Sequence, residues 1–463
     1  FDTALRIEQR YFTEIMQSKE AAAMIRSLFV SLQELNKGAR RPAGVADTKF
    51  KKIGILGAGF MGAGIAYVTA KAGIPVVLLD RDMASAEKGK AHSDSLMADQ
   101  VKKGRAKPED KDKLLSLITP TADYADLAGC DLVVEAVFED SAVKKEATEK
   151  AEAVLKSSAI FASNTSTIPI TSLAKNSARP KNFVGIHFFS PVDKMMLVEI
   201  ILGKKTGDKA LAVAFDFVRA IKKTPVVVND TRGFFVNRCV LRYISEAYKM
   251  LIEGVPAPMI ETGAKAAGMP VGPLALNDET AVDLAQKIMK QTIKDLGEKA
   301  VDAQEMALIN TMVDTHGRLG RKNGKGFYDY PAKPAKKRLW PGLKDLYPQL
   351  KPEKVDYDEL KQRLLVTIAL EAVRVMEEGI VTDPREADVG SILAFGFAPF
   401  TGGVLSYIDG IGAKRFVKIA KGLQKKYGAQ FKAPKLLLDM AEKGEAFYER
   451  FDPYQKGEVK QAA

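Results

Sequence analysis

A histidine and a glutamate twelve residues apart stand where a general base and its partner would be expected. His187 lies near the end of the apolar run 184–189, and Glu199 interrupts the apolar run 196–201. Burying a carboxylate without a partner is costly, and a histidine removes that cost. The pair would hold the imidazole in one tautomer and stabilise the imidazolium formed when a hydroxyl proton arrives. Taken alone, a histidine flanked by aromatic residues is more often a core or surface residue.

A polar segment, Ser163-Asn164-Thr165-Ser166-Thr167, directly follows the apolar run 159–162. If that run is a strand, the segment falls at a carboxyl end, as His187 does. Its hydroxyl and amide groups would then hold a substrate and a nicotinamide ring. A helix N-cap ahead of Ile168-Pro169 explains the same pattern equally well.

Charged residues follow a third apolar run, 131–137. Glu135 and Glu139 stand close to Lys144 in the chain, and the strand would bring them to the same edge. The alternative interpretation is a charge pair on a helix surface.

A glycine-rich segment indicates a dinucleotide cofactor. Gly57, Gly59 and Gly62 follow the run Ile53-Gly54-Ile55-Leu56, and Asp80 ends the next apolar run. The spacing predicts a tight turn, a close backbone approach to a pyrophosphate, and a helix whose N-terminal amides face the phosphates. The preceding strand, the following helix and the position of Asp80 all fit a dinucleotide site, which makes the motif more specific than an isolated GxGxxG. Because a carboxylate binds a ribose diol and repels a 2'-phosphate, Asp80 favours NAD over NADP.

Composition limits the other classes of function. With 463 residues, 46% of them apolar and 28% charged, the chain predicts two or three globular domains. The net charge of +12 is spread along the sequence without a nucleic-acid-binding signature, so no nucleic-acid partner is expected. A basic surface suits an anionic ligand such as a CoA thioester, although lysines that solvate helices explain it as well.

Further exclusions come from cysteines, histidines and hydropathy. Two cysteines rule out a disulfide framework and fit a reducing compartment, and three histidines without ligand spacing predict no metal site. No apolar run approaches the ~20 residues that span a bilayer, so no membrane association is predicted. Without a signal sequence or a C-terminal SKL, the expected location is the cytoplasm of a bacterium, with a peroxisomal origin left open. The abrupt start suggests a fragment of a longer protein.

These side chains require a particular order of elements. Residues 4–36 have helical periodicity and stop at Lys37-Gly38, which predicts one long amphipathic helix and a linker. From 51 to about 230, short apolar runs alternate with helical stretches, which predicts a doubly wound, mostly parallel sheet with its ligand beyond the carboxyl ends. The expected strands are 53–56, 76–80, 131–137, 159–162, 184–189, 197–201 and 225–228.

An internal repeat follows the predicted sheet. Asn237-Arg238, Glu246-Ala247 and Gly272-Pro273-Leu274 are echoed by Gln362-Arg363, Glu371-Ala372 and Ala398-Pro399-Phe400. We therefore expect an α/β fold: a Rossmann-type doubly wound sheet, preceded by a linker helix and followed by two tandem, homologous all-α domains. The predicted boundaries are 1–48 for the linker helix, 49–231 for the NAD-binding domain, 232–335 for the first helical copy and 350–463 for the second.

From about residue 1 to 460 the chain resembles the 3-hydroxyacyl-CoA dehydrogenase part of the multifunctional fatty-acid β-oxidation enzymes, of the bacterial α-subunit and peroxisomal bifunctional types. The N-terminal enoyl-CoA hydratase/isomerase domain of those enzymes has no counterpart here. The motifs that carry the resemblance are the Gly57 fingerprint, Ser163-Asn164-Thr165-Ser166, His187-Phe188-Phe189-Ser190-Pro191, Val198-Glu199 and Gly233-Phe234-Phe235-Val236-Asn237-Arg238.

The resemblance implies a set of site residues. The implied catalytic residues are His187, Glu199, Ser166 and Asn237. The implied cofactor contacts are Gly57, Gly59, Met61, Gly62, Asp80, Glu139, Lys144, Ser166, Ser190 and Lys322. The implied CoA contacts are Ser93, Lys103 and Ser166.

Two departures from the family pattern matter. Many single-function relatives have Asn where Ser190 stands, which puts one cofactor contact in doubt. Gln362 replaces Asn237 in the second copy, which implies that this copy lost its catalytic part and remains for packing. Relatives with one helical copy dimerise through it, so the duplicate is expected to supply the same contact within one chain. The resemblance also implies an exposed apolar face on the first helix.

The function expected from the residues and the resemblance is NAD-dependent oxidation of an L-3-hydroxyacyl-CoA to a 3-ketoacyl-CoA. The implied partners are an acyl-CoA substrate and, in a full-length complex, a thiolase β-subunit. Another enzyme class, the short 3-hydroxyacid or 6-phosphogluconate dehydrogenases, would rely on a catalytic lysine instead of the pair His187 and Glu199. A third possibility is a catalytically inert NAD-binding assembly module of a β-oxidation complex.

Overall fold

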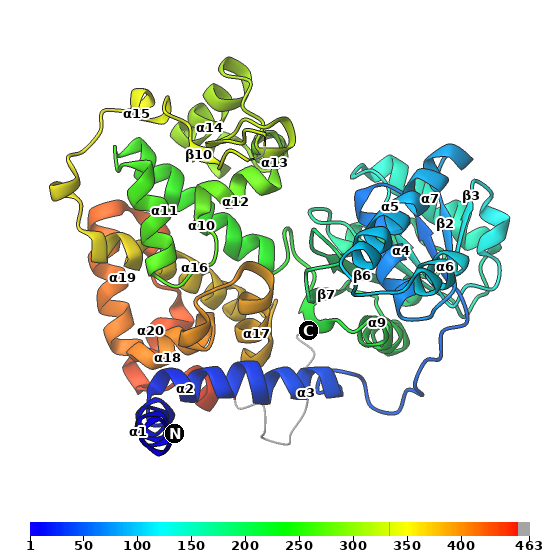
Figure 1. Ribbon diagram of the computed structural model, residues 1–463, viewed down its shortest axis with the longest axis horizontal. Coiled ribbons are helices and arrows are strands. Elements are labelled where there is room, and N and C mark those ends of the chain that lie inside the picture. Colours follow the sequence, from blue (N-terminus) through cyan, green and yellow to red (C-terminus); the bar gives the residue numbers. More distant parts are fainter. Residues whose placement is uncertain (333, 452–463) are drawn as a thin grey trace. The chain divides into compact units, whose positions relative to one another are not determined.

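The computed structural model describes residues 1–332 and 334–451, which form two compact units (Figure 1). The sheet unit consists of residues 25–237 and 378–394. Within the described residues, the helical unit consists of 1–24, 238–377 and 395–451. Each unit has its own buried core. No helix among the described residues is long and apolar enough to cross a membrane.

The sheet unit is built on eight strands in the order β3-β2-β1-β4-β5-β6-β7-β8, flanked by helices (Figure 1). Neighbouring strands are parallel except β6 and β7, which run antiparallel. The predicted doubly wound, mostly parallel sheet is therefore confirmed. The strands are β1 (Ile53–Leu56), β2 (Val76–Leu79), β3 (Ile118–Thr121), β4 (Leu132–Glu135), β5 (Ile160–Ser163), β6 (Phe183–Phe188), β7 (Leu197–Leu202) and β8 (Thr224–Asn229).

The strand order reverses between β1 and β4, and a ligand of such a sheet binds in the crevice at that reversal. Because β7 runs against β6, the beginning of β7 lies beside the end of β6. The helices of this unit are α4 (Phe60–Lys71), α5 (Met83–Lys102), α6 (Pro108–Ser116), α7 (Ser141–Val154), α8 (Ile170–Leu173), α9 (Asp208–Ala220), α3 (Leu32–Lys37) and most of α17 (Pro384–Phe395).

Strand β3 was not among the predicted strands. It lies at the edge of the sheet, only its first and last residues are buried, and it contains Pro120. A proline cannot donate a ladder hydrogen bond and is tolerated at a sheet edge. The other seven strands are almost wholly buried, which is why their apolar runs were visible in the sequence.

The prediction of one long helix over 4–36 is wrong. The segment divides into α1 (Asp2–Met16), α2 (Lys19–Met24), the π-helical turn η1 (Ile25–Ser31) and α3. The break has a local cause, because Ser18 Oγ accepts a hydrogen bond from the Ala21 amide and thereby starts a new helix. The predicted end holds, since Gly38 caps α3 in the left-handed conformation at φ 109°.

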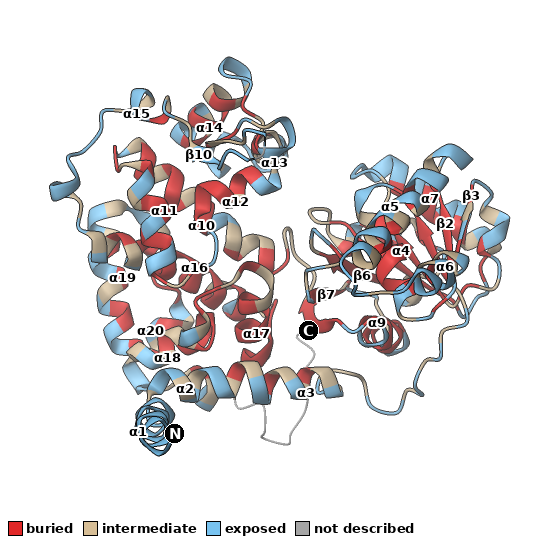
Figure 2. Cartoon of the chain, in the orientation of Figure 1, coloured by how far each residue is buried: buried red, intermediate tan, exposed pale blue. Residues whose placement is uncertain are grey.

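Helix α1 buries none of its residues (Figure 2). Phe12 and Ile15 expose 62% and 60% of their surface, and Phe1 exposes 95%. The apolar face expected on the first helix is therefore exposed.

The helical unit contains α10 (Val236–Ile252) from Arg238 onward and α16 (Tyr357–Glu377), which carry the repeated motifs. Arg238 of α10 donates to Glu371 of α16 at 2.7 Å, and Arg363 of α16 donates to Glu246 of α10 at 2.7 Å. The two arginines are 125 residues apart in the sequence, and so are the two glutamates. The arginine of each segment therefore pairs with the glutamate of the other, which makes the two ion pairs reciprocal. Such reciprocity is characteristic of a two-fold interface, here made within one chain.

The remaining helices of this unit complete its core. They are α11 (Ala257–Ala266), α12 (Pro273–Thr280), α13 (Val282–Leu296), α14 (Ala303–Asn310), α15 (Leu343–Leu346), α18 (Val404–Ile411), α19 (Ala413–Tyr427), α20 (Lys435–Lys443) and α21 (Phe447–Arg450). A small ribbon, β9 (Tyr328–Asp329) with β10 (Arg338–Leu339), follows the Gly324-Lys325-Gly326 segment. Residues 452–463 of the predicted second copy lie outside the described residues.

Candidate active site

The glycine-rich segment forms a tight loop between β1 and α4. Gly57 has φ 89°, a left-handed conformation that favours glycine. A Cβ added to Gly62 would lie 1.7 Å from the Gly57 carbonyl oxygen, so this position admits only glycine. A Cβ added to Gly59 would meet nothing within 4 Å, which leaves open space beside the backbone. These three environments match what a phosphate-binding turn requires.

The loop is suited to a dinucleotide in two further respects. No side chain caps the N-terminus of α4, so its first amides remain available to an anionic group. Asp80 follows β2 and accepts a hydrogen bond from the Ala58 amide at 2.6 Å, which fixes the acid beside the glycine loop. Its other oxygen accepts the Arg81 amide at 2.7 Å. The residues present therefore fit NAD.

His187 and Glu199 face each other across β6 and β7. They are register partners in the antiparallel pair, and His187 Nδ1 lies 2.8 Å from Glu199 Oε2. Both are buried, at 3% and 0% exposure. A carboxylate can only accept, so Nδ1 must carry the proton and Nε2 is left as the basic nitrogen. The geometry gives His187 one tautomer, with its free lone pair directed away from Glu199.

The basic nitrogen of His187 meets the loop that follows β5. Ser166 Oγ lies 3.0 Å from His187 Nε2. Asn237 Nδ2 donates to the Ser166 carbonyl oxygen at 3.2 Å. Four residues named from the sequence, His187, Glu199, Ser166 and Asn237, thus come together at one edge of the sheet.

The second oxygen of Glu199 is held by the turn in the 233–238 motif, a contact that the sequence did not predict. Glu199 Oε1 accepts the amides of Phe235 and Val236 at 3.1 and 3.0 Å. The turn depends on Gly233 at φ 74° and on Phe234 at φ 50°, an unusual conformation for a residue with a bulky side chain. The Phe234 ring packs near the His187 ring, with centroids 5.7 Å apart. Strained backbone of this kind concentrates at functional sites.

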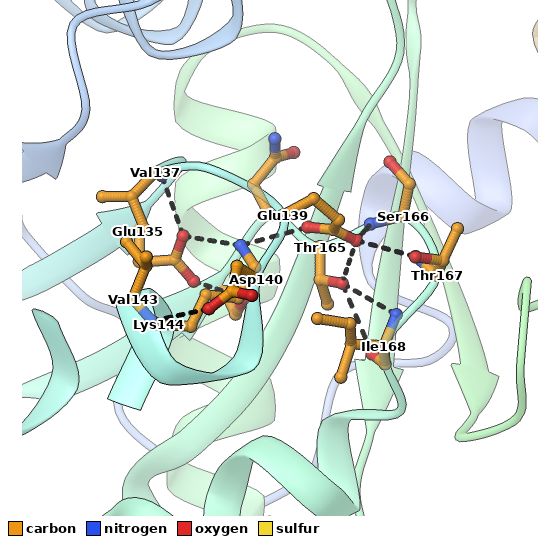
Figure 3. Close-up of polar contacts among 12 residues, drawn as sticks. Glu135, Val137, Glu139, Asp140, Val143, Lys144, Thr165, Ser166, Thr167 and Ile168 are labelled. Atoms are coloured by element: carbon orange, nitrogen blue, oxygen red, sulfur yellow. Dashed lines mark hydrogen bonds and ion pairs between the residues drawn. The ribbon is translucent and has the colours of Figure 1, made fainter. Parts of the chain in front are cut away.

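Glu139 clamps the loop that carries Ser166 (Figure 3). Its Oε1 accepts the Thr165 hydroxyl at 2.6 Å and the amides of Ser166 and Thr167, each at 3.0 Å. Burial alone would raise the pKa of Glu139, but Lys144 and these donors outweigh burial and lower it. The carboxylate is therefore ionised at neutral pH. Lys144 is 1% exposed, which excludes the alternative of a charge pair on a helix surface.

The polar segment after β5 forms a local turn, whereas α8 begins after Pro169 without a side-chain cap. Thr165 Oγ1 accepts the Ile168 amide at 3.0 Å, which is a local turn bond of the kind that an N-cap would make. Asn164 Oδ1 accepts the Phe188 amide at 2.8 Å and ties this loop to β6. Ser166 is left to face His187.

Other residues expected at the site are more scattered. Ser93 lies on the inner face of α5 and is fully buried, and its contact with CoA stays a prediction. Lys103 is exposed and donates to Asp99 at 2.6 Å. Met61 lies in the first turn of α4, and Ser190 is exposed just beyond β6. Lys322 belongs to the helical unit, where it pairs with Asp283.

Comparisons with known proteins agree with this geometry. The family model described as "3-hydroxyacyl-CoA dehydrogenase, NAD binding domain" matches residues 52–231, and the one described as "3-hydroxyacyl-CoA dehydrogenase, C-terminal domain" matches 233–330. The fatty acid oxidation complex subunit alpha of Shewanella loihica is 39% identical over 454 residues, which cover 96% of this chain and 62% of that relative. The chain thus spans less than two thirds of the length of this curated relative.

Solved structures give the same result. The (S)-3-hydroxybutyryl-CoA dehydrogenase of Ralstonia eutropha is 35% identical, with a TM-score of 0.57, and the match covers 61% of this chain and 100% of that one. The 3-hydroxybutyryl-CoA dehydrogenase of Escherichia coli K12 has a TM-score of 0.73 at 23% identity over 86% of this chain and 99% of that one, a likeness of fold. The chain belongs to the 3-hydroxyacyl-CoA dehydrogenase family.

Proposed function

We propose that this protein oxidises the hydroxyl group of an L-3-hydroxyacyl-CoA to a ketone with NAD. The observation that carries the proposal is the buried pair His187 and Glu199, whose 2.8 Å contact leaves the basic Nε2 beside Ser166. NAD, when bound, supplies the hydride acceptor. His187 Nε2 takes the hydroxyl proton, and Glu199 stabilises the imidazolium that results.

We assign to Ser166 and Asn237 the role of orienting the substrate oxygen. The Ser166 hydroxyl already occupies a hydrogen-bonding position at Nε2, 3.0 Å away, where a substrate hydroxyl would be received. Asn237 holds the Ser166 backbone at 3.2 Å. Because Asn237 fixes the Ser166 backbone before the substrate arrives, only the Ser166 hydroxyl has to turn from Nε2 to the substrate oxygen. Ser93 and Lys103 remain proposed contacts for CoA, and Lys322, Ser190 and Met61 remain proposed contacts for NAD.

The relatives suggest a wider setting for this activity. The Shewanella protein is named as a subunit of a fatty acid oxidation complex, so we place the reaction in fatty-acid β-oxidation in the bacterial cytoplasm. A thiolase β-subunit is proposed as the partner in such a complex. The one-copy relative from Ralstonia acts, by its name, on a hydroxybutyryl-CoA, which supports the CoA ester as substrate class.

The test is oxidation of NADH with acetoacetyl-CoA, run in parallel with free acetoacetate and with NADPH in place of NADH. We expect turnover only in the reaction that combines the CoA ester with NADH, and none with free acetoacetate or with NADPH. Binding of NADH without turnover of any substrate would instead favour an inert NAD-binding module.

A further inference from the structure

A buried glutamate that none of the catalytic steps uses stands at the end of β4. Glu135 has 0% exposure, and both of its carboxylate oxygens are occupied. Oε1 accepts the Lys144 ammonium at 2.8 Å and the Val137 amide at 2.9 Å, and Oε2 accepts the Ser163 hydroxyl at 2.7 Å. A buried carboxylate is tolerated only when it is paired in this way.

These three contacts reach three separate segments of the site. Val137 belongs to the loop after β4, whose Ala136 carbonyl oxygen would lie 2.6 Å from a Cβ on Gly57 and so packs against the nucleotide loop. Lys144 lies in α7, and Ser163 ends β5 directly before the Ser166 loop. Glu135 therefore joins the cofactor loop to the loop that meets His187.

A continuous series of contacts leads from Glu135 to His187 Nε2, and Figure 3 shows the part from Glu135 to Ser166. Lys144 bridges Glu135 at 2.8 Å and Glu139 at 3.2 Å. Glu139 in turn holds the Ser166 amide at 3.0 Å, and Ser166 Oγ lies 3.0 Å from His187 Nε2. Lys144 is almost fully buried, whereas the Glu139 side chain is 37% exposed.

The charges of Glu135, Lys144 and Glu139 explain why Glu135 affects the position of the 165–167 loop. One buried ammonium is shared by two carboxylates, and Glu135 is the more deeply buried of the two. If Glu135 lost its charge, Lys144 would keep a buried charge with Glu139 as its one carboxylate partner within residues 1–332 and 334–451. The attraction to Lys144 would then compete directly with the hydrogen bonds by which Glu139 holds the 165–167 loop.

We infer that Glu135 is a positioning residue that fixes the Ser166 loop and the cofactor loop relative to His187. The inference rests on the proposed function for its kinetic consequence. Its structural consequence, the placement of Ser166 at His187, is open to measurement whether or not the protein turns over.

The test compares Glu135→Gln with a matched control, Asp216→Asn. Asp216 also belongs to a buried ion pair of the sheet unit, with Arg41 at 2.7 Å, but it holds the segment before β1 through the Thr48 amide. Both variants lose one charge of a buried pair, so both are expected to lower the thermal midpoint of unfolding. Glu135→Gln alone is expected to weaken NADH binding about 10-fold and to lower kcat roughly 100-fold, as misplaced reacting groups do.

Histidine NMR supplies a readout that does not depend on turnover. The chain has three histidines, so the ring signals of His92, His187 and His316 can be assigned by single substitutions. Glu135→Gln is expected to move the His187 signal and leave that of His316, in the helical unit, in place, whereas Asp216→Asn should leave all three unchanged. If the wild-type protein fails to reduce acetoacetyl-CoA, the proposed function is wrong. The role of Glu135 is then still decided by two measurements, the NADH affinity and the His187 signal of the variants.

A second variant guards against loss of folding. Ser163→Ala removes only the Oε2 contact and keeps the ion pair with Lys144, and it is expected to move the His187 signal in the same direction and to lower kcat about 10-fold. A folded Glu135→Gln protein with wild-type NADH affinity, kcat and His187 signal would overturn the inference. So would an unfolded Glu135→Gln protein together with a Ser163→Ala protein indistinguishable from wild type.

Discussion

Glu246 and Glu371 occupy equivalent positions in the two repeated segments, yet their carboxyl pKa values move in opposite directions. Burial raises the pKa of Glu246 to about 7, because Arg363 is shared with Glu253 and does not offset burial. Burial also acts on Glu371, but the charges of Arg242, Arg238 and Arg374 outweigh it and lower its pKa. The two glutamates should therefore respond differently to pH.

For Glu246, a folded-state pKa above the unfolded value means that the folded protein binds the proton more tightly. Its contribution to stability is present below about pH 4.5 and is lost as the pH rises through about 7. Glu246→Gln has no carboxyl group to ionise and therefore does not lose this stability as the pH rises. Between pH 5 and 8 the urea midpoint of the variant should fall less than the urea midpoint of the wild type. An unchanged slope in this range would contradict the assignment.

Glu371→Gln is the control for that experiment. Because the folded-state pKa of Glu371 lies below the usual value of 4.5, its contribution to stability is present above that pH and is lost only as the pH falls through the lowered value. Between pH 5 and 8 this variant should be less stable than wild type by a constant amount, about 3 kcal/mol or more for a broken buried pair.

His187→Gln tests the general base. The amide side chain fills similar space but cannot accept a proton, so kcat should fall by roughly 10²- to 10⁴-fold. Because His187 does not belong to the nucleotide loop, NADH affinity measured by fluorescence titration should change less than threefold. Retention of kcat within tenfold of wild type would exclude His187 as the base.

Glu199→Gln tests the partner of that base. A glutamine oxygen accepts, but its amide donates, so the two amides of Phe235 and Val236 and the His187 Nδ1 proton can no longer all be satisfied. We expect a loss in kcat of about 10²-fold or more, together with a lower unfolding temperature. The pH profile of kcat, compared with that of wild type, separates the two effects, since a purely structural loss leaves its shape unchanged.

Asp80→Asn tests cofactor choice. The asparagine oxygen can keep the hydrogen bond from the Ala58 amide, so the glycine loop should retain its shape. Loss of the negative charge removes the repulsion of a 2'-phosphate, and kcat/KM for NADPH relative to NADH should rise about 10-fold. A ratio equal to that of wild type would show that another group selects the cofactor.

Two glycine substitutions separate folding from cofactor binding. Gly62→Ala places a methyl group against the Gly57 carbonyl oxygen and should lower the unfolding temperature of the sheet unit. Gly59→Ala adds a methyl group in open space, so the fold should be unaffected while NADH affinity falls about 10-fold or more where the phosphates approach. Equal NADH affinity in Gly59→Ala and wild type would place the phosphates elsewhere.

The pair of His187 and Glu199 was predictable because a carboxylate in a buried strand requires a partner. Their register across β6 and β7 was not, since it follows from the one antiparallel pairing in the sheet. The nucleotide loop was predictable because glycine spacing, strand and helix all depend on local chain geometry. The turn at Gly233 and Phe234 was not, because a left-handed phenylalanine is stabilised only by the packing around it.

Three other features escaped the sequence pattern for physical reasons. The division of the first helical segment depends on the hydroxyl of Ser18, which caps a helix in one context and continues it in another. The position of Glu135 as a junction depends on three contacts from residues up to 28 positions away, which no local period encodes. Burial of Ser93 likewise follows from the face of α5 that packs inward.

The reciprocal ion pairs between α10 and α16 also bear on how the two segments can change over time. Where two identical chains meet about a two-fold axis, every substitution occurs at both ends of the interface. Here each end is encoded separately, so one end can be altered while the other is preserved. Glu246 with one arginine, Glu371 with three, and Gln362 opposite Asn237 in the alignment of the segments record such independent drift. A substitution at one of these ion pairs therefore leaves the residues of the other pair as they are.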